Sequence, residues 1–332
     1  MDPLDFSLVI PTYNGADRLP SLFQCLRRCW HHSHSHRPSL RGEIILVDNN
    51  SQDATPAITH QEALTWDQRC PLHYVLEPRQ GAAYARHRGI HQAQGTIVGF
   101  VDDDNWPEPG WILAALDFAD AHPQAGAFGS QIHGAFQVPP DPALKPLFPF
   151  LALVERGDRP LLYVPHKKIL PPSAGLVVRR QVWLDCTPDR PYLTGRTAST
   201  MITGEDLEAL AHIQRRGWEL WYNPAMVMHH QIPLWRLDRA YLIPFFRGIG
   251  LSRHITRMAV LPPLQRPLWV LIYGVTDWLK ILIYGCGFHI LGQKTLVLEC
   301  YLTLAWYSAR SFWHFLGIKA EASPGGRGSN IG

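Results

Sequence analysis

The chain has 332 residues, enough for one large domain or two small domains with a hydrophobic core. Hydrophobic residues make up 46% and charged residues 18%, a composition that excludes a largely disordered protein. The formal net charge is only +3, which argues against a nucleic-acid partner because such proteins carry a strong basic excess.

Cysteine usage and the amino terminus bear on the compartment. The six cysteines lack the regular spacing of a disulfide framework, which favours a reducing compartment. The first residues have no basic segment ahead of an apolar stretch, so no signal peptide is visible. We therefore expect a cytoplasmic protein.

Four apolar runs, each followed by a polar turn and a helical pattern, occupy the first part of the chain. They span residues 6–10, 43–47, 72–76 and 97–101. Strands that alternate with helices predict a Rossmann-like, mostly parallel α/β sheet with helices on both faces. Ligands of such sheets bind beyond the carboxyl ends of the strands, where all four runs carry polar or small residues.

The fourth run leads straight into three carboxylates, Asp102, Asp103 and Asp104. Three adjacent like charges stay ionised only if a cation or several hydrogen-bond donors share their place. Oxygen ligands at a strand end suit Mg²⁺ or Mn²⁺, which bind through one or two carboxylates plus substrate phosphates. A solvated acidic turn is the competing interpretation, since Asp is common in loops.

The other strand ends suggest a nucleotide. The first strand is not followed by the glycine pattern of dinucleotide-binding sites, and the P-loop pattern is absent from the sequence. The polar and small residues at the strand ends, beside an acidic cluster, instead predict a crevice for a nucleoside diphosphate with its metal. These residues are Thr12, Asn14, Asp48, Asn49 and Gly81.

The order of these motifs resembles the family 2 glycosyltransferases. The chain carries VIPTYN, VDNNSQD, a Gly81 loop with YARHRG, FVDDDN and Gly-Glu-Asp in that order, and the resemblance covers about residues 5–235. It implies the GT-A fold and an inverting, metal-dependent transfer of a sugar. The donor would be a nucleoside-diphosphate sugar, and the acceptor a hydroxyl of a glycan or a lipid-linked molecule.

Three further stretches resemble a narrower group, the cyanobacterial glycosyltransferases of hormogonium polysaccharide biosynthesis. The stretches are AGAFGSQIHGAF (125–136), KKILPPSAGLVVRR (167–180) and GLSRH (250–254). This resemblance implies a role in exopolysaccharide biosynthesis.

The family pattern assigns roles to the strand-end residues. Asp104 would be the metal ligand, with Asp102 as a further metal residue, and Asp102 and Asp103 would lie against the ribose, the metal waters or the diphosphate. Asn49 stands where the commoner motif has Asp, and its amide could still pair with a uracil, thymine or guanine edge. The residues expected to bind the nucleotide sugar are Pro11, Thr12, Tyr13, Asn14, Asp48, Asn49, Gly81, Arg86, Asp102 and Asp103.

Glu205 and Asp206 follow Gly204 and open a predicted helix over 207–216. Thr203 and Asp206 have the spacing of a helix capping box, so a purely structural role is one interpretation. The family places its general base in this motif, and the resemblance therefore implies that Asp206, rather than Glu205, accepts the proton of the acceptor hydroxyl.

His229 and His230 follow a predicted strand pair over 220–222 and 224–228. The family often completes its metal or diphosphate site with a histidine at this point. The alternative is a histidine satisfied at the sheet edge, and the sequence does not say which of the two faces the site.

Beyond residue 235 the composition changes to arginines and aromatics, followed by apolar segments at 268–291 and 296–317. Asp277 and Glu299 interrupt them, and a central Asp costs roughly 2.5–3.5 kcal/mol on membrane insertion. We expect these segments to lie in the membrane interface or to pack as a helical hairpin rather than to span. Basic residues ahead of them would bind an anionic cytoplasmic leaflet of the inner membrane.

The predicted organisation is a glycosyltransferase domain over 1–235, a helical extension over 236–320 and a disordered tail over 321–332. The domain divides into a nucleotide-sugar half, about 1–125, and an acceptor half, about 126–235. A catalytically inactive nucleotide-sugar-binding or scaffolding protein of the same fold is the alternative function. The oligomeric state, the sugar, the base and the linkage are not given by the sequence.

Overall fold

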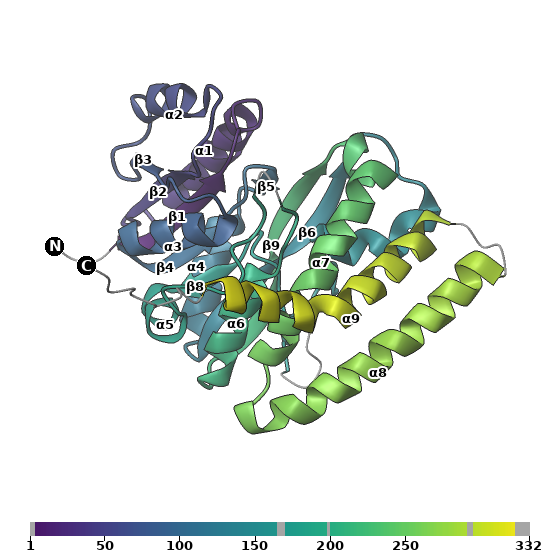
Figure 1. Cartoon of the computed structure of the whole chain (residues 1–332). Helices are drawn as coiled ribbons and strands as arrows, with labels where there is room; N and C mark the ends of the chain where they lie inside the picture. The colour runs from purple at the N-terminus through teal and green to yellow at the C-terminus, as the bar shows by residue number, and fades with distance from the viewer. Residues whose placement is uncertain (1–3, 165–169, 198–199, 291–294, 323–332) are drawn as a thin grey trace, which may run out of the picture.

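The computed structural model describes residues 4–164, 170–197, 200–290 and 295–322. They form one nine-stranded sheet in the order β3-β2-β1-β4-β8-β6-β9-β5, with β7 paired to β9 (Figure 1). This arrangement confirms the predicted Rossmann-like α/β sheet, and the sheet as a whole is mixed, because the first four strands are parallel whereas β5, β7 and β8 pair antiparallel with their neighbours. The predicted tail from residue 323 onward lies outside the described residues, and residues 321 and 322 belong to the last helix.

The first four strands confirm the sequence prediction to within two residues at each end. β1 pairs in parallel with β2 and β4, and β2 pairs in parallel with β3. Their carboxyl ends therefore meet at one edge, where Thr12 is opposite Asp48. The bounds are β1 (Leu4–Thr12), β2 (Gly42–Asp48), β3 (Leu72–Leu76) and β4 (Gly95–Phe100).

The acceptor half continues the same sheet. β8 lies antiparallel between β4 and β6, and β6 runs parallel to β9. The two predicted strands around Pro224 are one strand, β9, with a register shift after Asn223. The bounds are β5 (Asn105–Pro107), β6 (Ala125–Phe136), β7 (Leu161–Leu162), β8 (Val177–Arg179) and β9 (Glu219–Ile232).

Helices cover both faces of the sheet. On one face α1 packs against α2 and α4, and on the other α6 packs against α3 and α5. Buried apolar side chains recur along α1 at Leu19, Leu22, Phe23 and Leu26, the helical spacing that turns one stripe toward the sheet. The bounds are α1 (Leu19–His36), α2 (Thr55–Ala63), α3 (Ala82–Gln92), α4 (Trp111–Ala121), α5 (Arg180–Cys186) and α6 (Glu205–Arg215).

The carboxyl-terminal helices pack onto the acceptor half. α7 contacts α6 and α9, whereas α8 packs mainly on α9 and lies on the outside (Figure 1). A second apolar core joins them to the sheet through Phe246, Ile232 and Cys300. The bounds are α7 (Arg239–Ala259), α8 (Arg266–Gly285), a π-helical turn (Cys286–Ile290) and α9 (Leu296–Ala322), with short 3-10 helices at Pro142–Leu151, Leu234–Leu237 and Pro263–Gln265.

α8 and α9 confirm the two predicted apolar helices, and α7 lies within the predicted helical extension over 236–320, although its bounds were not predicted. Among the described residues, one helical segment, Pro263–Ile290, is long and apolar enough to cross a membrane by length and composition, since an 18-residue window of it has a mean hydropathy of 1.3 and only 6% of that window is buried. Asp277 in the middle of α8 is nevertheless buried. It accepts hydrogen bonds from Arg257 on α7 (2.6 and 2.9 Å) and from Ser308 on α9 (2.6 Å).

Candidate active site

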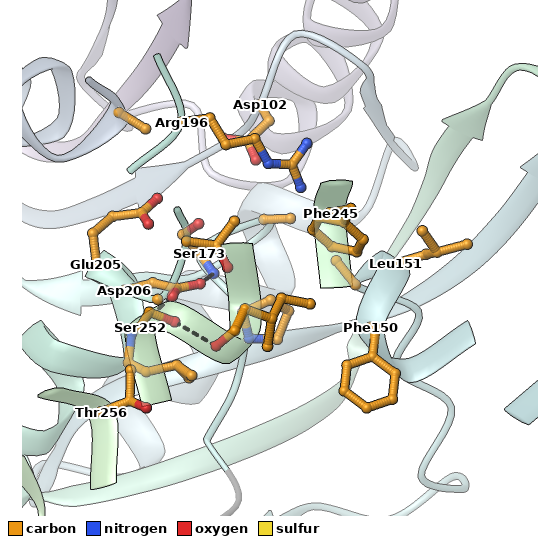
Figure 2. Close-up of a pocket in the computed structure, with 18 of the residues that line it drawn as sticks. Asp102, Phe150, Leu151, Ser173, Arg196, Glu205, Asp206, Phe245, Ser252 and Thr256 are labelled. Atoms are coloured by element: carbon orange, nitrogen blue, oxygen red, sulfur yellow. Dashed lines mark hydrogen bonds between the residues drawn. The ribbon is translucent and has the colours of Figure 1, made fainter. Parts of the chain in front are cut away.

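A cavity of about 1130 Å³ opens where β1 and β4 end and extends to α7 and α8. Most of the predicted site residues line it although they are up to 219 positions apart (Pro11 and His230). Figure 2 shows Glu205 and Asp206 in this cavity, with Asp206 beside Ser173. The predicted residues in its lining are Pro11, Thr12, Tyr13, Asn49, Arg86, Asp102, Asp103, Asp104, Glu205, Asp206 and His230.

Asp104 lies beside His230 because of strand register. β5 pairs antiparallel with β9, and Asn105 is opposite His230 in that ladder. The His230 Nε2 atom is therefore 3.5 Å from Asp104 Oδ2, and both side chains are buried. Arg236 donates to both atoms, at 2.7 Å to Asp104 Oδ2 and 2.9 Å to His230 Nε2.

The surroundings keep Asp104 ionised. Burial alone would raise the pKa of its carboxyl, but the neighbouring His230 and Arg236 outweigh burial and hold this pKa well below its usual range. An ionised carboxylate and an imidazole nitrogen that face one cavity are ligands suited to Mn²⁺ or Mg²⁺. The residues present thus fit a divalent cation, and Arg236 supplies the positive charge in this structure.

Asp103 is held by Thr12 and Arg18, a different pair of residues from those that bind Asp104. Its Oδ2 atom accepts a hydrogen bond from Thr12 at 2.5 Å, and the Arg18 guanidinium donates to both of its oxygens at 2.8 Å. Burial raises the pKa of the Asp103 carboxyl, an effect that Arg18 opposes and the charge of Asp104 reinforces. Asp103 therefore ties the end of β4 to the turn after β1.

Asp102 and Glu205 share one arginine. Arg86 on α3 donates to Asp102 Oδ1 at 2.9 Å and to Glu205 Oε1 at 2.8 Å, and its side chain is almost fully buried. Burial and the charge of Asp206 raise the pKa of the Glu205 carboxyl, whereas Arg86 lowers it. Both carboxylates are thus committed to Arg86.

Asp206 differs from Asp102, Asp103, Asp104 and Glu205, each of which pairs with an arginine. It accepts hydrogen bonds from the backbone N–H groups of Ser173 (2.9 Å) and Leu207 (2.8 Å), and no arginine, lysine or histidine in the described residues forms an ion pair with it. The capping-box interpretation is wrong, because Gly204 occupies the N-cap position in a left-handed conformation and no side chain caps the helix. Asp206 is therefore an oriented carboxylate with spare acceptor capacity.

His229 and His230 take opposite sides of β9, as successive residues of a strand do. His229 pairs with Glu108 at 3.0 Å and does not line the cavity. His230 lines it and lies beside Asp104. The metal-ligand expectation for His229 is thus not supported by its placement.

Four of the residues predicted to bind the nucleotide, Asn14, Asp48, Asn49 and Gly81, stabilise the loops around the cavity. Asn49 uses its amide on backbone groups of Glu77, Arg79 and Gly81, so little of the amide is left for a base edge. Asp48 accepts from Tyr74 OH and the Ser51 N–H. Asn14 and Gly81 occupy turns with positive φ, and neither they nor Asp48 line the cavity.

Six arginines of the cavity lining were not predicted as site residues: Arg18, Arg156, Arg196, Arg236, Arg253 and Arg257. It grouped Arg236 and Arg253 with a basic segment expected to face an anionic membrane. The structure turns both of them into the cavity, and pairs Arg239 with Glu299. Helical spacing within α7 carried a weak signal for Arg253 and Arg257, four residues apart on one side.

Comparison with known proteins adds the family. Residues 7–158 match the model described as "Glycosyl transferase family 2". The matched residues make up just under half of the chain. The match ends before Glu205, so it includes neither Glu205 and Asp206 nor His230 and the carboxyl-terminal helices α7 to α9.

Curated relatives align with the same region. This chain is 34% identical to Glycosyltransferase AglE of Haloferax volcanii over 107 residues, which are 32% of each chain. It is 31% identical to the amylovoran biosynthesis glycosyltransferase AmsB of Erwinia amylovora over 110 residues, which are 32% of this chain and 33% of that one. The aligned region thus spans about a third of these relatives.

A solved structure resembles the whole chain. The mannosyltransferase PcManGT from Pyrobaculum calidifontis, in complex with GDP-Man and Mn²⁺, matches with a TM-score of 0.56 and 16% identity. The match covers 95% of this chain and 90% of that one. At this identity the likeness establishes the fold, which is the GT-A fold that the sequence predicted.

Proposed function

We propose that the protein is an inverting glycosyltransferase that moves a sugar from a nucleoside-diphosphate sugar to a hydroxyl of a glycan or lipid-linked acceptor. One observation carries the proposal. Asp206 is the cavity carboxylate without a cationic partner among the described residues, and it shares the cavity with the acidic end of β4. An arginine-paired carboxylate is a poor proton acceptor, whereas Asp206 is oriented and available.

The reaction needs few parts from the chain. The acceptor hydroxyl oxygen bonds to the anomeric carbon as the bond from that carbon to the diphosphate oxygen breaks. The hydroxyl proton goes to Asp206, and the electron pair leaves with the nucleoside diphosphate. Direct displacement with one base inverts the anomeric configuration.

The donor would lie across the carboxyl ends of β1 and β4. Pro11, Thr12 and Tyr13 line that part of the cavity and would contact the base and ribose. Asp104 and His230 would hold Mg²⁺ or Mn²⁺, with Asp102 close by. When bound, the cation would stabilise the charge on the departing diphosphate.

The acceptor and its location follow from the helical extension. The exposed apolar side of α8 favours binding to the cytoplasmic face of the inner membrane, and the unpaired cysteines are consistent with a reducing compartment. An amylovoran biosynthesis enzyme among the relatives supports a role in polysaccharide assembly.

A donor screen tests the function. UDP-, GDP- and dTDP-sugars are incubated with the protein and Mn²⁺ or Mg²⁺, and binding and hydrolysis are measured. We expect one donor to bind in a cation-dependent manner. With the matching acceptor, Asp206→Asn should lower the transfer rate about 10²–10⁴-fold while donor binding persists.

Asp104→Ala should instead abolish cation-dependent donor binding. Normal turnover in Asp206→Asn would remove that residue from the mechanism. Donor binding without any measurable transfer to glycan or lipid-linked acceptors would favour the inactive binding protein.

A further inference from the structure

The cavity continues past Asp206 into a second compartment between α7 and α8. Its lining there comes from one side of each helix and mixes cationic, hydroxyl and aromatic groups. Nothing in the assigned chemistry of donor and base uses these side chains. They are Ser252, Arg253, Thr256 and Arg257 on α7 and Trp269, Tyr273, Thr276 and Lys280 on α8.

Arg253 stands out because no carboxylate pairs with it. Asp277 is the acidic group whose charge acts on it, but the carboxylate of Asp277 is already bonded to Arg257 and Ser308. No hydrogen bond or ion pair of the Arg253 guanidinium occurs within the described residues, although its neighbour Arg257 has two. Desolvation, followed by the charge of Arg257, lowers the pKa of Arg253 to about 10.

The Arg253 side chain is half-buried, yet it is desolvated as strongly as a deeply buried group. The cavity accounts for both properties. The guanidinium lies deep in the molecule but borders a space that solvent reaches. A cation held there keeps its donors free for a ligand.

The compartment carries excess positive charge. Arg253, Arg257 and Lys280 contribute three positive charges, and Asp277 contributes one negative charge, so two positive charges are uncompensated. Lys280 is exposed on α8 and Arg253 lies deeper on α7. A phosphate group carries between one and two negative charges, and a guanidinium matches it with two parallel hydrogen bonds.

The compartment also connects two features that a lipid-linked acceptor needs. A Cβ atom placed on Gly204, the residue before the Glu205–Asp206 motif, would lie 2.8 Å from Thr256 Cγ2, so α7 touches the start of α6. Figure 2 shows Ser252 and Thr256 next to Asp206. On the outer side of α8 an apolar stripe is 57–69% exposed, formed by Leu268, Leu271, Val275, Trp278 and Leu282.

We propose that Arg253, with Lys280 at the mouth, binds the phosphate or diphosphate group of a lipid-linked acceptor. The lipid chain would leave along the apolar stripe of α8, and the glycan end would extend toward Asp206. This inference rests on the proposed function and specifies its acceptor. The aromatic and apolar neighbours, Trp269 and Ile272 among them, favour a lipid phosphate over a free phosphate ion.

The test measures binding of farnesyl phosphate to the full chain by isothermal titration calorimetry. Farnesol, which lacks the phosphate, and inorganic phosphate, which lacks the lipid, are titrated in parallel. We expect farnesyl phosphate to bind at least tenfold more tightly than either. Arg253→Gln should weaken it about tenfold, which is about 1.4 kcal/mol, and Arg253→Lys should restore part of the loss.

Arg247→Gln is the matched control, because it removes one positive charge from the exposed side of α7 outside the cavity. It should leave farnesyl phosphate binding unchanged. Lys280→Gln gives a second reading at an exposed position if Arg253→Gln does not fold, and it should weaken binding severalfold. Equal binding in Arg253→Gln and Arg247→Gln would overturn the assignment, as would inorganic phosphate that binds as tightly as farnesyl phosphate.

Donor binding separates this inference from the function on which it rests. UDP and GDP with Mn²⁺ are titrated into the same variants, and Arg253→Gln should bind them as the unaltered protein does. Weaker nucleotide binding in Arg253→Gln would place Arg253 in the donor site and overturn the proposal. Failure of every donor, with farnesyl phosphate still bound through Arg253, would overturn the glycosyltransferase function alone.

Discussion

Arg86 and Glu205 lie 119 residues apart and are joined by a hydrogen bond of 2.8 Å. The same guanidinium donates to Asp102 at 2.9 Å. Arg86 therefore connects the acidic end of β4 to the helix that carries Asp206. The two halves of the candidate site are aligned by one buried cation between two carboxylates.

Arg86→Gln should lower the free energy of unfolding by about 3–5 kcal/mol, because it leaves two buried carboxylates without their cation. The measurement is equilibrium unfolding in urea. Arg69→Gln is the control, since Arg69 pairs with Asp67 at the surface and should behave as the unaltered protein does. Equal midpoints for the two variants would show that Arg86 does not hold the halves together.

The sequence predicted the fold well where local pattern determines it. The strands ending at Thr12, Asp48 and Leu76 are short, largely apolar runs, and their carboxyl ends had to meet once the sheet was parallel. Asp104 and Asp206 followed from ordered motifs. Their placement in one cavity agrees with those roles, while the roles themselves stay proposals.

The partners of these residues could not be predicted, because they depend on register and long-range packing. Choosing His230 over His229 required the pairing of β5 with β9. Arg236 and Arg253 were interpreted as part of a basic surface, because no local sequence feature distinguishes an arginine that points into a cavity from one that points to solvent. From the sequence, the Asn49 amide was expected to be available to a base. In the structure it is bonded to the Gly81 loop, because the Gly81 N–H donates to its Oδ1 atom.

Arg236→Gln should tighten Mn²⁺ binding in the absence of donor by roughly tenfold. In this structure the guanidinium contacts both Asp104 and His230, so a cation that binds there must displace it. Removing the positive charge removes that competition and its repulsion. Free Mn²⁺ is measured by electron paramagnetic resonance during a titration.

Asp104→Asn serves as the opposite control and should weaken Mn²⁺ binding. Weaker binding in Arg236→Gln would instead mean that Arg236 supports the site and does not compete for it.

Asp277→Ala should cost about 3–5 kcal/mol of stability, because it leaves Arg257 buried without its partner. The double variant Asp277→Leu with Arg257→Met should recover most of the loss, since apolar side chains replace both charges. Thermal unfolding of the three proteins gives the comparison, with exposed Asp158→Ala as the control. A double variant as unstable as the single one would mean that the pair is required for helix packing itself.

The apolar stripe of α8 should mediate membrane binding. Leu271→Glu with Val275→Glu places two charges on a side that is already exposed, so the fold is retained while the gain from apolar burial in the interface is lost. Flotation with phosphatidylglycerol and phosphatidylethanolamine vesicles should drop at least fivefold. Leu64→Glu, at a still more exposed position beyond α2, should float normally.

Arg253→Met should raise the melting temperature, by about 2 °C, in the protein without ligand. If Arg253 stabilised the fold, its removal would instead lower the melting temperature. Arg253 has no counter-ion in the described residues and is partly desolvated, so its charge costs stability until an anion arrives. Solvent in the cavity screens the charge, which keeps the expected gain to about 1 kcal/mol.

Ligand provides the internal control for this last variant. Farnesyl phosphate should raise the melting temperature of the unaltered protein and leave that of Arg253→Met nearly unchanged, because binding to the folded state stabilises it only in proportion to affinity. A fall in the melting temperature of ligand-free Arg253→Met would assign Arg253 to the scaffold. A rise, together with the lost ligand response, would identify a residue kept for binding at the expense of stability.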